Sequence, residues 1–277
     1  MSRGVRLFVW CCLVVGGAVF LLPFYWMVIS SLKAPGAAGI YRIPPTLFAW
    51  PLHVENYPAA LGALPFARYL ANTLVVTLLC IAGQVVSASL VGYGFARLRF
   101  RGRNALFVLL LSTMMLPGQV TMIPLFLMFR ALGWIDTFAP LVVPSFFGGS
   151  AFFVFLFRQF FLTIPRELEE AARIDGCSHF EIWWRIFMPL SKPVIVTTVL
   201  FTFMSAWNDF LGPLIYLNSP ENRTLAVGLL AFKDQYDRIE AHLLLAVSTL
   251  MMLPCLVLFF VGQKYFVKSV ATTGMKG

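Results

Sequence analysis

The sequence predicts an all-α, polytopic membrane protein with six transmembrane helices. Of its 277 residues, 60% are hydrophobic and only 12% are charged, whereas soluble domains carry about 25% charged residues. The apolar residues gather in six stretches long enough to cross a bilayer. Such a chain has too few polar residues to cover its apolar surface in water. The composition therefore excludes a disordered chain, a disulfide-stapled secreted module and an ordinary cytosolic enzyme.

The six predicted spans are residues 7–32, 67–96, 105–129, 138–157, 193–217 and 241–265. The first follows Arg3 and Arg6, as the apolar core of a signal peptide would. Its apolar run is too long for that, and bulky Phe24, Tyr25 and Trp26 stand where small cleavage-site residues belong. We interpret it as a retained span.

The basic residues predict the orientation of the spans. With the N-terminus inside, 14 of the 21 Lys and Arg residues fall on the cytoplasmic side. This bias follows the positive-inside rule and predicts that both termini are cytoplasmic. The formal charge of +9 then lies against the anionic inner leaflet, so no nucleic-acid partner is needed to explain it.

Several of the spans contain proline. Pro117 and Pro124 lie in the third span, Pro213 in the fifth and Pro254 in the sixth. Each proline frees a backbone carbonyl that lipid cannot satisfy, so protein or a wetted cavity must do so. Broken helices of this kind are typical of transport pathways, although a simple packing kink gives the same pattern.

Polar residues inside the spans are the candidates for a translocation pathway, because lipid penalises them unless they have partners or water. Small and hydroxyl residues of the second span also suit close helix packing. The fifth span places a carboxylate in its outer half. The candidate residues are Asn72, Gln84, Gln119, Asn208 and Asp209.

Residues 163–189, on the predicted cytoplasmic side, read as a hairpin of two short helices. Pro165 and the acidic residues after it suit the start of a helix. Asp175 and Gly176 form a turn signal. Ser178 and Glu181 then make a capping box for the second helix, which Pro189 ends. Helical spacing aligns an aromatic face comprising Phe180, Trp183, Trp184 and Phe187. An amphipathic hairpin resting on lipid is the alternative interpretation.

The hairpin resembles the EAA loop of ABC importer permeases. The matching residues are Glu170, Ala171, Ala172, Asp175, Gly176, Ile186 and Pro189. Met188 stands where that pattern has leucine. Similarity to the carbohydrate-uptake permeases of the maltose-transporter type extends to Arg97-Leu98-Arg99-Phe100, Trp207-Asn208-Asp209-Phe210 and the terminal Lys276-Gly277.

The resemblance implies an ABC type-1 transmembrane domain in a bacterial-type cytoplasmic membrane. It implies that the matching residues dock onto a cytoplasmic ABC ATPase dimer. It also implies a second, homologous permease and an extracytoplasmic solute-binding protein that delivers a sugar or oligosaccharide. Residues 67–265 would form the transport core, preceded by a first helix and Pro-rich external loop (1–66) and followed by a cytoplasmic tail (266–277).

Chemistry-bearing motifs agree with a non-enzymatic subunit. The sequence contains no Gly-Lys dipeptide and therefore no phosphate-binding loop, and it contains no HExxH or GxSxG motif. Its three histidines and five cysteines are scattered. We therefore expect no cofactor, metal or catalytic residue in this chain, with ATP and Mg²⁺ bound by the partner ATPase.

Two other functions remain open at this stage. Arg68 and Arg130, near the predicted outer face, are compatible with glycerol phosphate or another polar solute instead of a sugar. A self-contained secondary transporter would need paired charges within the spans. Asp209 is the main charged residue that the predicted spans contain.

Overall fold

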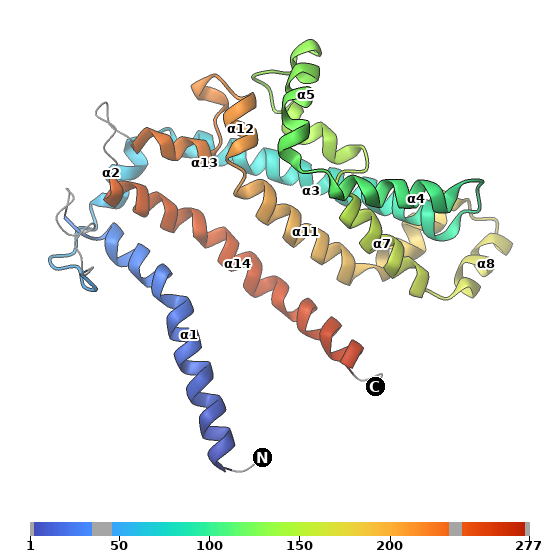
Figure 1. The fold of residues 1–277 in the computed structure, drawn as a ribbon, viewed down its shortest axis with the longest axis horizontal. Helices are drawn as coiled ribbons and strands as arrows, with labels where there is room; N and C mark the ends of the chain where they lie inside the picture. The colour runs from blue at the N-terminus through green and yellow to red at the C-terminus, as the bar shows by residue number, and fades with distance from the viewer. Residues whose placement is uncertain (1–2, 35–45, 233–239, 275–277) are drawn as a thin grey trace. The chain divides into compact units, whose positions relative to one another are not determined.

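The computed structural model describes residues 3–34, 46–232 and 240–274, and the chain is helical through most of them (Figure 1). Four helical segments are long and apolar enough to cross a membrane, and six result if each sharply bent pair is one span. The four are Arg3–Ser31, Phe66–Arg97, Ala139–Thr163 and Ala241–Gln263. The all-helical membrane fold predicted from the sequence is confirmed.

The chain divides into two compact units. The first consists of Met1–Phe66 and Gly228–Cys255, and the second of Ala67–Val227 and Leu256–Gly277. The helices of the first unit are α1 (Arg3–Ser31), α2 (Asn56–Gly62), a 3-10 turn (Leu229–Phe232) and the first part of α14 (Ala241–Gly274). Buried Asn56 joins α1 to α2, because its amide donates to the backbone oxygens of Ser31 and Lys33 at 2.8 Å.

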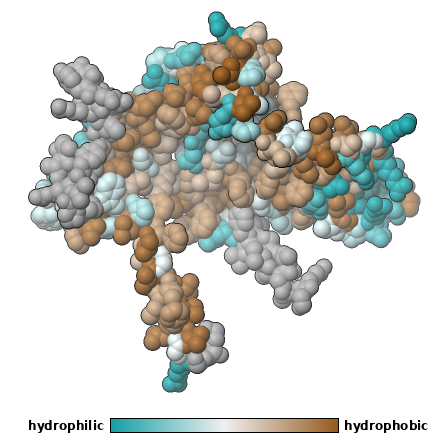
Figure 2. Space-filling view, viewed as in Figure 1, coloured by the Kyte–Doolittle hydropathy of each residue, from teal (hydrophilic) through white to brown (hydrophobic). Residues whose placement is uncertain are grey.

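The second unit carries most of the helices and begins with α3 (Phe66–Arg97). Next come α4 (Arg103–Ser112), α5 (Gly118–Ala131), α6 (Ala139–Val142), α7 (Ala151–Thr163), α8 (Arg166–Ile174), α9 (His179–Ile182) and α10 (Met188–Leu190). It continues through α11 (Lys192–Trp207), α12 (Leu211–Tyr216) and α13 (Leu225–Gly228). Figure 2 shows hydrophobic residues along the helices of this unit and hydrophilic ones gathered at the end that carries α8.

The core of the second unit forms where α3 packs against α7. A Cβ at Gly92 of α3 would lie 2.8 Å from the Phe157 Cβ and 3.2 Å from the Val154 oxygen of α7. Only glycine permits this approach. Phe157 and Phe161 are fully buried there, and Tyr93 contacts Phe161 edge to face at 6.3 Å. The hairpin helices pack onto the same cluster.

Three of the predicted spans are broken rather than continuous. The third bends by 99° between the 3-10 turn Thr113–Met115 and α5, and Pro117 stands at the break. The fifth ends as α11 at Trp207 and restarts as α12 at Leu211. Pro213 therefore lies in the first turn of α12, where its missing N–H costs no helical bond, and not inside a continuous helix as the sequence predicted.

The fourth span is also interrupted, and side chains of α3 satisfy its open backbone groups. Between α6 and α7 run a 3-10 turn (Val143–Phe146) and two glycines with positive φ. Cys80 donates to the Leu141 oxygen at 3.2 Å, and Ser87 to the Ser145 oxygen at 2.7 Å. Gln84, between them on the same helix face, accepts from the Ser150 N–H at 3.1 Å.

The α3–α7 contact generates the first prediction. Gly92→Ala places a methyl group against the α7 backbone, and we expect the free energy of unfolding to fall by about 1–3 kcal/mol. Gly94→Ala is the matched control, because nothing lies within 4 Å of a Cβ there and alanine favours the helix. Thermal unfolding in detergent measures both. Equal midpoints for the two variants would contradict the close contact.

Candidate functional site

The hairpin begins with α8 and turns at Gly176. Glu167 and Glu169 occupy the first turn of α8, where the helix dipole favours acidic side chains. Gly176 has a φ of +83°, which favours glycine strongly. Its N–H donates to the Arg173 oxygen at 3.1 Å, and the next N–H, of Cys177, to the Ala172 oxygen at 2.9 Å. This pair of bonds is a Schellman motif, so the corner is closed by its own backbone.

The second helix starts with the predicted capping box, which is confirmed. The Glu181 N–H donates to the Ser178 hydroxyl oxygen at 3.3 Å, and the Ser178 N–H donates to the Glu181 carboxylate at 2.9 Å. These bonds from Ser178, backbone first and then hydroxyl, lower the pKa of Glu181. The capping box therefore stays formed down to a lower pH than an ordinary glutamate would allow.

The predicted aromatic face is only half correct. Trp183 and Phe187 are buried in the core, but Phe180 and Trp184 are exposed. A π-helical turn (Trp183–Phe187) widens the helix at this point and changes the angle between successive side chains. The second helix also runs past Pro189 to Leu190 and bends by 82° into α11, instead of stopping at the proline.

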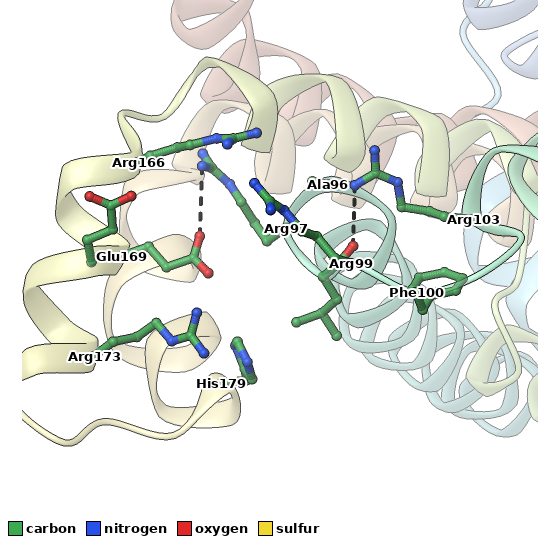
Figure 3. Close-up of a pocket in the computed structure, with 11 residues that line it drawn as sticks. Ala96, Arg97, Arg99, Phe100, Arg103, Arg166, Glu169, Arg173 and His179 are labelled. Atoms are coloured by element: carbon green, nitrogen blue, oxygen red, sulfur yellow. Dashed lines mark hydrogen bonds and ion pairs between the residues drawn. The ribbon is translucent and has the colours of Figure 1, made fainter.

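Arg97, at the end of α3, joins the hairpin to the core (Figure 3). It donates to the backbone oxygens of Phe161 and Ile164 at the end of α7 and faces Glu169 of α8 at 3.8 Å. Its guanidinium also lies 4.9 Å from the centre of the Phe187 ring. Sequence reasoning assigned Arg97 only to the positive-inside count and the family resemblance, and missed this anchoring role.

The matching hairpin residues divide into an exposed tip and a buried base. Glu170, Ala171, Asp175 and Gly176 are exposed, and so is Ile174, at 86% of its surface. Ala172 is buried, and Ile186 packs against the core cluster, so these two hold the hairpin in place. Pro189 is exposed, within α10. Nothing in the sequence pattern indicated the exposure of Ile174 except its place beside the turn.

Two candidate pathway residues hold backbone groups of neighbouring segments. Asn72 of α3 donates to the backbone oxygens of Glu221 and Arg223, at 2.8 and 2.9 Å. Gln84, which is 5% exposed, satisfies the start of α7 through Ser150 as described above. Both side chains thus fix loops or breaks, which is the packing alternative that the sequence left open.

The remaining three candidates lie at helix breaks. Gln119 is exposed in the first turn of α5, just after Pro117. Asn208 donates to the Met204 oxygen at 2.8 Å and ends α11. Asp209, which is half-buried, accepts a bond from the Gly212 N–H at 3.1 Å in the first turn of α12. Asn208 and Asp209 therefore form the junction of the broken fifth span.

Asp136, which the sequence did not single out, joins the loop between α5 and α6 to the loop after α12. It has a φ of +63° and accepts bonds from Asn218 N and Ser219 N, both at 2.9 Å, and from the Ser219 hydroxyl. Asn222 donates to it as well. These bonds, that of the Ser219 hydroxyl first, lower the pKa of Asp136 to about 2, so the clamp persists through the physiological range.

Taken together, the broken apolar helices and the self-capped polar hairpin with an exposed apolar tip define an all-helical, multi-pass membrane protein. Residues 84–272 match the family described as binding-protein-dependent transport system inner membrane component. The chain belongs to this family. It is thus a non-catalytic, multi-pass inner-membrane subunit of an ABC transporter, and membership implies ATPase and binding-protein partners.

Named relatives match along nearly the whole chain. The arabinooligosaccharides transport system permease protein AraQ of Bacillus subtilis is 35% identical over 94% of this chain and 92% of its own length. The sn-glycerol-3-phosphate transport system permease protein UgpE of Rhizobium meliloti is 33% identical over 94% of both chains. The inner membrane ABC transporter permease protein YcjP of Escherichia coli is 32% identical over 98% of this chain and 97% of its own.

A solved structure shares the fold. It is a crystal structure of a bacterial ABC transporter involved in the import of the acidic polysaccharide alginate. The matching chain is 25% identical, with a TM-score of 0.82 over 96% of this chain and 99% of that one.

The junction of the fifth span generates the second prediction. Asp209→Ala removes the acceptor for Gly212, worth about 1 kcal/mol, and frees the start of α12. We expect lower uptake at unchanged membrane abundance. Asp209→Asn keeps an acceptor oxygen and should retain most of the uptake.

Uptake measured against immunoblotted membrane protein tests this prediction. Equal uptake by Asp209→Ala and the parent would rule out a role at the junction. An asparagine variant as impaired as the alanine variant would instead assign the effect to the charge of Asp209.

Proposed function

We propose that this chain is a membrane-spanning permease subunit of an ATP-driven importer that translocates a sugar or oligosaccharide delivered by an extracytoplasmic binding protein. The observation that carries the proposal is the hairpin, whose exposed tip and buried base occur in a chain of the binding-protein-dependent family. In this proposal a second homologous permease completes the pathway and a dimer of ABC ATPases supplies the energy.

The tip of the hairpin suits a groove on the ATPase. Ile174 supplies an apolar contact, and Glu170 and Asp175 place acidic groups beside it. An apolar anchor with a charged rim is the usual composition of a specific interface. The base connects through Arg97 to α3 and α7. A movement of the ATPase would therefore reach the membrane helices through packed and hydrogen-bonded groups.

The orientation follows from the charge distribution. Placing both termini and the hairpin in the cytoplasm puts 14 of 21 basic residues on that side and the tip within reach of an ATPase. We assign residues 67–265 to the transport core. The breaks at Gln119 and at Asn208 and Asp209, with Asn72 and Gln84 as supports, are our proposed lining and scaffold of the pathway.

The relatives support an oligosaccharide more than other solutes. AraQ is named for arabinooligosaccharides, and the matching crystal structure is of a transporter for the polysaccharide alginate. Sugars are bound mainly through hydrogen bonds and aromatic stacking, so spans with few charges suit them. Glycerol 3-phosphate is a second candidate solute, because UgpE matches the same share of the chain.

The docking role generates the third prediction. Gly176→Val forces a β-branched residue into a left-handed conformation, which costs about 1–2 kcal/mol, and distorts the tip. We expect a membrane-inserted protein that loses its co-purifying ATPase, and transport with it. Glu170→Lys should act similarly by reversing the charge at the tip.

Gly133→Val is the matched control. Gly133 also has positive φ (+69°) and open space around it, but lies beyond α5, outside the hairpin. Co-purification of the ATPase with tagged permease is the measurement. If Gly176→Val retains the ATPase as well as Gly133→Val does, the hairpin is not the docking element and rests on lipid instead.

The solute is tested by uptake in cells that carry the whole transport system, and this is the fourth prediction. We expect radiolabelled oligosaccharide to be accumulated in an energy-dependent way and to be lost when this gene is deleted. Unlabelled glycerol 3-phosphate should not compete. Competition by glycerol 3-phosphate, with no oligosaccharide uptake, would overturn the sugar assignment in favour of the second candidate.

A further inference from the structure

A groove lined by arginines runs beside the hairpin (Figure 3). Two clefts, of about 580 and 520 Å³, share Arg99, Phe100, Arg103 and Arg166 in their walls and so form one groove. We call it the arginine groove. Its arginines come from the end of α3 and the segment after it, from the start of α4 and from both ends of α8.

The smaller of the two clefts, at the α4 end of the arginine groove, holds positive charge without a matching carboxylate. The residues that line this smaller cleft are Arg99, Phe100, Gly102, Arg103, Asn104, Ala105 and Arg166. Among the residues described, the arginines in ion pairs are Arg97 and Arg185. In the larger cleft, Glu169 already faces Arg97, and Glu170 is the other acidic residue in the wall. The unbalanced positive charge therefore lies in the smaller cleft.

Backbone donors add to this charge. Gly102, with a φ of +82°, precedes α4 and offers no side-chain cap. The Arg103 N–H donates to the Phe100 oxygen and the Leu106 N–H to the Gly102 oxygen. Asn104 and Ala105, between them, also line the groove and belong to the first turn of α4, where backbone N–H groups have no helical acceptor and the helix dipole is positive. Guanidinium groups and a helix start together suit a phosphate.

We propose that the arginine groove binds the phosphodiester headgroup of an anionic phospholipid in the cytoplasmic leaflet. This inference rests on the orientation proposed above. Basic pockets between helices at the cytoplasmic side are suited to such headgroups. The rim supplies a second reason, because Phe100 and Leu106 are 43% and 49% exposed and the apolar surface continues along α4 through Val108 and Leu109.

That apolar continuation favours a lipid over an acidic segment of a protein partner. A phospholipid joins its phosphate to acyl chains, so one molecule can occupy the groove and cover the exposed face of α4. An acidic peptide would satisfy the arginines and leave that face uncovered. The groove would then tie the end of α3 and the start of the hairpin to the membrane surface through one lipid.

The test is native mass spectrometry of the tagged full-length chain, purified with its co-assembling subunits and titrated with phosphatidylglycerol or phosphatidylcholine. Arg99→Gln/Arg166→Gln removes two charges from the groove. We expect roughly tenfold weaker phosphatidylglycerol binding, since each basic group near an anionic headgroup contributes a several-fold effect. Phosphatidylcholine binding should not change.

Arg6→Gln/Arg101→Gln is the matched control, because it also removes two basic residues on the same predicted side and neither lines the groove. Parental phosphatidylglycerol binding in this control supports the proposal. Equal loss in both double variants overturns it in favour of general charge attraction. Unchanged lipid binding with loss of the co-purifying ATPase overturns it in favour of an acidic protein segment. Because lipid is counted directly, the result does not depend on which solute is transported.

Discussion

The buried guanidinium of Arg97 is the interaction on which the working parts of this chain depend. Its side chain is only 4% exposed, and a charge taken out of water is costly unless other groups replace its hydration. Here two backbone oxygens at the end of α7 and the Glu169 carboxylate of α8 replace it. The same group thus satisfies open carbonyls, pairs a buried acid and holds three helices together. Removing it would take this partner from the Ile164 oxygen and the Glu169 carboxylate, and would leave the Phe161 oxygen with the Ile164 N–H.

The need to give every buried polar group a hydrogen-bond partner also shapes the broken spans. Lipid offers no hydrogen bonds, so each interruption of a helix must be satisfied by protein. Cys80, Gln84 and Ser87 follow one face of α3 and satisfy the break between α6 and α7. Asp136 does so for the loop after α12. The polar residues of this apolar chain are therefore mostly structural, and what they hold in place is an interrupted set of helices.

Features set by neighbouring residues could be predicted from the sequence, and features set by distant partners could not. The capping box at Ser178 and the turn at Gly176 are local, so their residue types indicate them directly. The bend at Pro117 was indicated by the proline itself, whereas the end of α11 at Trp207 and the restart at Leu211 were not. For the same reason the anchoring by Arg97, the exposure of Ile174 and the partners of Asn72 had no signal in the sequence.

The corner of the hairpin is closed on both sides by hydrogen bonds within the hairpin. The Schellman bonds at Gly176 and the capping box at Ser178 involve no residue outside residues 172–181. The hairpin also contacts α3, where the Tyr93 hydroxyl lies 3.4 Å from the His179 Nδ1. In the docking that we propose, a corner closed by its own backbone would act as a stiff lever, so that a push at Ile174 would reach the Arg97 contacts at the base of the hairpin with little local bending. The bends within the membrane-spanning segments would then be the places where the helices change their angle.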